Sequence, residues 1–133
     1  MEWKLEVVRV PVADVDRAKR FYSEQAGFVV DVDRQISDEA RIVQLTPRGS
    51  ACSIVLLSGG GMRPGSLEGV QLVVSDIEAA REELLQRGVE VSAVQHFEGG
   101  AMVPGRGEDW NSFIFFSDPD GNAWTVQEHR AGD

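Results

Sequence analysis

The chain carries the same strand–turn–strand pattern twice, and this duplication limits the folds that it can adopt. The run from Ile42 to Ala51 aligns without gaps on the run from Ile114 to Ala123, at a constant offset of 72 residues. Each copy places a proline and then a glycine in its turn, where proline presets φ and glycine takes the left-handed conformation. The sequence therefore predicts two hairpins of one kind, each closing one half of the chain.

A second repeat opens each half. The run from Val70 to Asp76 matches the run from Val8 to Asp14 at an offset of 62 residues. Both runs alternate apolar residues as a half-buried strand does, and both end at an aspartate, a preferred helix N-cap. Apolar residues at helical spacing follow each aspartate, namely Val15, Ala18 and Tyr22 in the first half and Ile77, Ala80, Leu84 and Leu85 in the second.

The two repeats together predict an α+β chain of two tandem βαβββ modules. We expect a single domain over residues 1–133, with module one at about 1–57, a connector at about 58–67 and module two at about 68–133.

Two features of module two need separate mention. Val89–Val91 is expected to begin a strand directly after the second helix. The stretch from Gln95 to Asp109 is rich in glycine and charge, and we expect a long loop there, which in a compact domain is usually functional or mobile.

Composition excludes some classes of partner. The net charge of −9 argues against nucleic acid or an anionic membrane surface, because both select basic patches. Cys52 is the single cysteine, so no internal disulfide forms and a cytoplasmic location is expected. No apolar run has the length of a membrane span, and the first residues do not follow the pattern of a signal peptide.

The strand, aspartate and helix at Val12–Tyr22, followed late in the chain by the turn Asp118–Asn122, resemble the vicinal oxygen chelate superfamily. That superfamily includes glyoxalase I, extradiol dioxygenases, fosfomycin-resistance transferases and bleomycin-resistance proteins. The resemblance implies the glyoxalase/bleomycin-resistance fold, in which cupped mixed sheets carry helices on their outer face. It also implies a homodimer and a small-molecule ligand.

The resemblance further implies where a metal would bind. In metal-dependent members the ligands lie on the opening and closing strands, at positions that here hold Val7, Ser53, Gly69 and Thr125. None of these is a histidine or a carboxylate, whereas a divalent cation needs several oxygen or nitrogen donors. We therefore expect no cofactor. A divalent metal held by relocated ligands stays open, and the donors available for it are Glu6, His96, Glu128 and His129.

Without a metal, the side chains that face the cup become the candidate ligand site. Arg9 and Gln71 occupy equivalent positions in the two modules, and Arg9 either pairs with a surface acid or meets the ligand. Trp124 alternates onto the helix-facing side and is expected in the core. The other candidate ligand-binding residues are Ser53, Thr125 and Gln127 on the strands and Phe97 and Trp110 beside the long loop, with Gln44 joining them if its strand keeps register.

Three functions fit these residues. The leading hypothesis is a small-molecule-binding protein of the bleomycin-resistance type without metal chemistry. A second is a metal-dependent enzyme of the glyoxalase or dioxygenase type that uses relocated ligands such as Glu128. A third is a metal-free lyase or isomerase with Glu128 or His96 as general base, a role that needs only one well-placed residue. The sequence identifies neither the ligand nor the catalytic residues.

Overall fold

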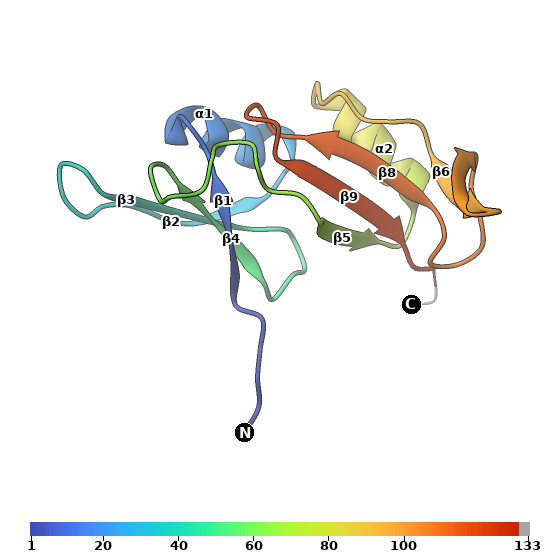
Figure 1. Ribbon diagram of the computed structural model, residues 1–133, viewed down its shortest axis with the longest axis horizontal. Helices are drawn as coiled ribbons and strands as arrows, with labels where there is room; N and C mark the ends of the chain where they lie inside the picture. The colour runs from blue at the N-terminus through green and yellow to red at the C-terminus, as the bar shows by residue number, and fades with distance from the viewer. Residues whose placement is uncertain (131–133) are drawn as a thin grey trace. The chain divides into compact units, whose positions relative to one another are not determined.

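The computed structural model describes residues 1–130, and the chain divides into two compact units (Figure 1). The first unit comprises Met1–Leu67 together with Asp118–Asn122. The second comprises Glu68–Ser117 together with the chain from Ala123 onward. These boundaries cut across the sequence repeat, because the closing turn of module two belongs to the first unit.

The first unit has the predicted βαβββ order. Its four-stranded sheet runs β1-β4-β3-β2, with β1 and β4 parallel and the other pairs antiparallel. A π-helical turn, η1, extends the helix, and Gly27 follows at a φ of 80°, a left-handed conformation that glycine tolerates. The elements are β1 (Val7–Pro11), α1 (Val15–Arg20), η1 (Phe21–Gln25), β2 (Val29–Gln35), β3 (Arg41–Thr46) and β4 (Ser53–Leu57).

Apolar alternation builds the core of the first unit. Asp14 caps α1 as predicted, because its carboxylate accepts the Arg17 backbone N–H at 3.1 Å. Helix α1 packs against β4 and buries Ala18, while Tyr22 is buried in η1. One side of the sheet contributes fully or almost fully buried residues, which are Val10, Val43, Leu45, Ile54 and Leu56.

The second unit repeats this order with one extra strand. Its five-stranded sheet runs β5-β9-β8-β6-β7, and β5 is parallel to β9 (Figure 1). Asp76 caps the helix as predicted and accepts two backbone N–H groups, from Glu78 and Ala79. The elements are β5 (Val70–Val74), α2 (Ile77–Gln86), β6 (Gln95–Glu98), β7 (Ala101–Pro104), β8 (Phe113–Ser117) and β9 (Ala123–Glu128).

Three expectations for module two were wrong. The expected strand at Val89–Val91 is reduced to one isolated bridge, between Val91 and Phe116. The expected long loop contains the β6–β7 hairpin, whose two-residue turn Gly99–Gly100 has positive φ at both positions, as a primed turn requires. Leu85 is 40% exposed, so it lies outside the buried stripe of α2.

The turn Asp118–Asn122 belongs to the first unit, where its two end residues are buried. Asn122 is fully buried, donates to the Pro11 carbonyl at 2.9 Å and accepts the Leu67 backbone N–H at 3.0 Å. Tyr22 donates its hydroxyl to the Asp118 carboxylate at 2.7 Å. Gly65 passes so close that a Cβ there would lie 2.0 Å from the Asp120 carbonyl oxygen. This turn therefore completes the packing of residues more than fifty positions earlier in the chain.

Candidate functional site

Strand β9 separates two faces of the second sheet. Trp124, Val126 and Glu128 are buried on the side that carries α2, as alternation predicts for Trp124. The opposite side is here called the open face. The register of β9 with its two neighbours, β5 and β8, places the side chains of this face in two rows. Thr125 pairs with Gln71 and Phe115, and Gln127 pairs with Val73 and Phe113. The open face of the second sheet thus consists of Gln71, Val73, Phe113, Phe115, Thr125 and Gln127.

This open face combines apolar rings with oriented amides. The Phe113 and Phe115 rings are parallel within 10°, with centroids 6.4 Å apart. Gln71 donates through Nε2 to Oε1 of Gln127 at 2.6 Å, and Gln127 donates in turn to the Trp110 carbonyl at 2.7 Å. These bonds fix the orientation of both amides. Apolar and aromatic side chains with a few precisely placed polar groups are the usual lining of a small-molecule site.

Trp110 and His129 stand at the end of this face. Their rings stack with centroids 3.8 Å apart, and Trp110 is half-exposed. Asp109 lies within 3.1 Å of His129 Nδ1 and also accepts the Arg130 backbone N–H at 2.6 Å. That backbone bond is the main reason why the pKa of Asp109 lies below its usual value, with His129 contributing. From the sequence, His129 was considered only as a possible metal donor, although alternation from Thr125 puts it in phase with the open face.

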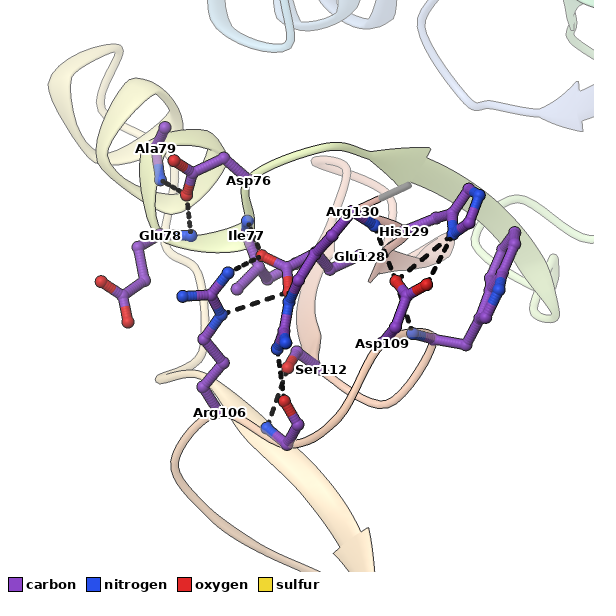
Figure 2. Close-up of polar contacts among 12 residues, drawn as sticks. Asp76, Ile77, Glu78, Ala79, Arg106, Asp109, Ser112, Glu128, His129 and Arg130 are labelled. Atoms are coloured by element: carbon purple, nitrogen blue, oxygen red, sulfur yellow. Dashed lines mark hydrogen bonds and ion pairs between the residues drawn. The ribbon is translucent and has the colours of Figure 1, made fainter. Parts of the chain in front are cut away.

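Glu128 lies on the other side of β9 and is fully buried (Figure 2). Its carboxylate accepts the Ile77 backbone N–H at 2.9 Å, two bonds from Arg106 at 3.2 and 3.1 Å, and one from Arg130 at 2.6 Å. Burial raises the pKa of Glu128, but these donors outweigh it and the pKa is lowered. The Glu128 carboxylate thus points toward the start of α2 and away from the open face.

His96 and Phe97 line a separate cleft of about 410 Å³ in the second unit. The cleft also contains Arg106, Asn111 and Arg130. His96 Nδ1 lies 2.8 Å from the Gly105 carbonyl, which can only accept, so Nδ1 carries the proton. The structure therefore brings together Gln71, Thr125, Gln127 and Trp110 from the predicted site, and it puts His96 and Phe97 in the cleft.

The other predicted site residues belong to the first unit. Arg9 is exposed and pairs with Val55 in the sheet register, and its side chain makes no hydrogen bond or ion pair within residues 1–130. Gln44 pairs with Val55 from the opposite side, so it shares the open face of the first sheet with Arg9. The Ser53 hydroxyl is buried and lies 2.6 Å from that of Thr46.

The side chains at the positions of the family metal ligands do not fit a divalent cation. Val7 and Gly69 offer no donor, and the Ser53 hydroxyl is already paired with Thr46. Within the described part of the chain, no three or more His, Cys, Asp or Glu residues are grouped so as to hold a metal. Within that same part, no helix is long and apolar enough to cross a membrane.

Fold and site define a class of protein. Two modules, the second with one extra strand, each pair their opening and closing strands in parallel, and the second places a polar and aromatic face opposite its helix. The model of the Glyoxalase/Bleomycin resistance protein/Dioxygenase superfamily matches residues 4–126, and the chain belongs to this family.

Several relatives resemble the whole chain. TnmS3, an antibiotic binding protein from Streptomyces sp. CB03234, is 32% identical with a TM-score of 0.78, over 96% of this chain and 97% of that one. A superfamily member from Sphaerobacter thermophilus DSM 20745 is 27% identical with a TM-score of 0.76, over 96% and 98% of the two chains. The uncharacterised protein YetH of Bacillus subtilis (strain 168) is 28% identical, over 94% of this chain and 98% of its own length.

Proposed function

We propose that this protein binds a small organic molecule, of the kind represented by antibiotics, on its open sheet faces and without metal chemistry. The observation that carries the proposal is the open face of the second sheet, where parallel phenylalanine rings adjoin two amides fixed by hydrogen bonds. Similarity over nearly the full chain to the antibiotic binding protein TnmS3 supports it. The side chains at the family's metal-ligand positions support the metal-free part.

The residues suggest what each contributes to binding. Phe113 and Phe115 offer apolar area, and burying such area stabilises a complex by roughly 25 cal/mol per Å² before the costs of association. Gln71 and Gln127 have amide groups that recognise hydrogen-bonding atoms at the edge of a ligand. Arg9 is the cationic donor of the first unit, and its paired N–H groups suit a carboxylate or another oxygen-rich anion.

The proposal includes a homodimer in the cytoplasm. Strands β1 and β5 are edge strands of their sheets, and unpaired edges invite pairing with another chain. Val73 on β5 is 59% exposed, which gives that edge an apolar side chain to bury. A single cysteine fits a reducing compartment. Sedimentation should report about twice the chain mass of 14.6 kDa, and a monomer at micromolar concentration would contradict this part.

Calorimetric titration with a panel of antibiotics that includes bleomycin tests the function. At least one should bind, and Phe115→Ala should weaken it about tenfold or more. Leu85→Ala is the matched control, because Leu85 is an exposed apolar residue of α2 and should leave affinity unchanged. If no compound bound, or if both variants weakened binding equally, the proposal would be wrong.

Elemental analysis of protein purified without chelator tests the metal-free part. Substoichiometric nickel, zinc, iron and manganese are expected, and chelation should leave antibiotic binding unchanged. One tightly held transition metal per chain, whose removal abolishes binding, would contradict it.

A further inference from the structure

Asp109 and His129 form a fixed pair beside the open face of the second sheet. Both carboxylate oxygens of Asp109 lie within 3.3 Å of His129 Nδ1. One of them also accepts the backbone N–H groups of Trp110 at 3.1 Å and Arg130 at 2.6 Å. Two backbone N–H groups therefore fix the Asp109 carboxylate in place. The His129 imidazole is fixed by this carboxylate and by its stack on Trp110.

The bonding of this pair decides where the imidazole proton lies. The backbone N–H of Arg130, with smaller help from His129 and Trp110, holds the pKa of Asp109 below its usual range, so the carboxylate is ionised at neutral pH. An ionised carboxylate only accepts hydrogen bonds, and Nδ1 must therefore be the donor. In the neutral ring this leaves a lone pair on Nε2, which makes no hydrogen bond within residues 1–130.

Strain at the neighbouring residue indicates that the arrangement is imposed by its surroundings. Trp110 has a φ of 68°, and among residues 1–130 it alone combines a side chain with a positive φ. Such conformations cost about 1–3 kcal/mol and persist where surrounding contacts determine them, often at ligand sites. Here Gln127 binds the Trp110 carbonyl and Asp109 binds its N–H, so the strained residue connects the pair to the open face.

The chain also fixes the side to which His129 belongs. The His129 backbone N–H donates to the Val74 carbonyl at 2.8 Å, which continues the β5–β9 ladder beyond Glu128. Alternation then puts His129 on the side of Gln127, and Figure 2 shows it turned toward Asp109, away from the Glu128 cluster. Its side chain is about a quarter exposed, at 28%, and so accessible to a ligand that lies over Gln127.

We propose that His129, positioned by Asp109, accepts the proton of an acidic hydroxyl group, a phenol or an enol, on a ligand bound at the open face. In this step the ligand's O–H bond breaks and an Nε2–H bond forms, while the electron pair stays on oxygen. The resulting phenolate or enolate faces an imidazolium whose charge is balanced by Asp109. The inference rests on the proposed function and specifies the ligand class.

The first test needs no ligand. The chain has two histidines, so long-range ¹H–¹⁵N correlation spectra contain two imidazoles, which His96→Phe and His129→Phe assign. At a pH where His129 is neutral, we expect its proton on Nδ1. Asp109→Asn should produce a mixture of tautomers for His129 and leave His96 unchanged, since an amide can either donate or accept. A proton on Nε2 in the wild-type protein would overturn the inference.

The second test compares 4-nitrophenol with 4-nitroanisole, which lacks the acidic proton. Wild-type protein should bind the phenol at least tenfold more tightly and convert it to the phenolate, seen as visible absorption, at a pH where the free phenol is mostly protonated. His129→Phe keeps a ring on Trp110 but removes both nitrogens, and both effects should disappear. His96→Phe should retain them.

The outcomes separate the inference from the proposed function. If both probes perturb the Phe115 and Thr125 resonances equally, in wild type and in His129→Phe, the open face binds ligands and the role of His129 is overturned. If neither probe perturbs these resonances, the inference is also overturned. Failure of the proposed function shows separately, as the absence of binding across the antibiotic panel.

Discussion

The two modules differ sharply in the last buried side chain of their closing strands. Leu56 on β4 pairs with Val10, Glu128 on β9 pairs with Val74, and both are fully buried on the helix-facing side of their sheets. Leu56 makes apolar contacts. Glu128 instead has a carboxylate that joins the start of α2 to Arg106 and Arg130. A charge is tolerated there because every strong acceptor direction is matched by a donor.

The turns that precede these strands differ in the same direction. Ser50 and Asn122 are aligned, but the Ser50 hydroxyl bonds only to the backbone of Cys52 and is exposed. Asn122 is buried and bonds to Pro11 and Leu67. In both comparisons the second module has long-range polar contacts that the first module lacks. The predictions that follow test this in matched pairs, beginning with the largest effect.

Asn122→Ala should lower the free energy of unfolding by about 3 kcal/mol. The substitution leaves the Leu67 N–H without its partner and the Pro11 carbonyl with only the longer bond from the Gly65 N–H at 3.3 Å, and each such loss costs about 1–3 kcal/mol. Ser50→Ala is the matched control and should cost about 0.5 kcal/mol or less. Urea denaturation measures both. Equal losses of unfolding free energy in the two variants would show that the two turns contribute equally to stability.

Glu128→Leu, which installs the residue type that β4 buries at Leu56, should cost about 2 kcal/mol. The variant loses the bond to the Ile77 N–H, but its arginines are 43% and 36% exposed and regain water, which keeps the loss below that of a sealed ion pair. A stabilised Glu128→Leu protein would show that the carboxylate is retained for another reason.

The same variant has a defined pH dependence. The pKa of Glu128 is lower in the folded protein than in the unfolded chain, so its contribution is present above the unfolded value of about 4.5. That contribution is lost as pH falls through the folded value. The stability difference between wild type and Glu128→Leu should therefore shrink on acidification, as denaturation at a series of pH values would measure. A difference that grew would contradict the assigned ion pairing.

Asp76→Ala should cost about 1 kcal/mol, the usual value for a lost N-cap. Asp14→Ala, its counterpart, should cost somewhat less, because Asp14 accepts one backbone N–H where Asp76 accepts two. Thermal melting of the two variants gives the comparison. The reverse order would show that the cap matters more to the six-residue α1 than to the ten-residue α2.

Arg9→Met should change the free energy of unfolding by less than about 0.5 kcal/mol, since Arg9 is exposed and without a partner within residues 1–130. Affinity for an anionic or oxygen-rich ligand should fall roughly tenfold, or about 1.4 kcal/mol. Gln71→Met, the aligned change, tests whether the two modules contribute equally. A collapsed melting temperature with unchanged affinity would make Arg9 a structural residue.

Sequence pattern predicted the elements of the fold well where local chemistry decides them. The caps at Asp14 and Asp76 follow from capping preference, and the buried Trp124 follows from alternation. The β6–β7 hairpin was missed because its signal, Gly99–Gly100 between two short strands, was hidden among charged residues.

The candidate site was harder to predict, because its contacts join residues that are distant in sequence. Alternation placed Gln71 and Gln127 on one face, yet the bond between them depends on the parallel register of β5 and β9. The Asp109–His129 pair depends on a positive φ at Trp110, which no propensity indicates for tryptophan. Such contacts become visible only when the tertiary register is known.

The inclusion of Asp118–Asn122 in the first unit has a consequence for biosynthesis. A ribosome synthesises residues 1–67 of the first unit before it makes this turn, so the Pro11 carbonyl and the Leu67 N–H lack their bonds to Asn122 until that residue has been added. Domains usually fold as units in the order of their synthesis. In this chain the unit that begins first is finished almost last, and nascent chains stalled before residue 118 should remain protease-sensitive in their N-terminal half.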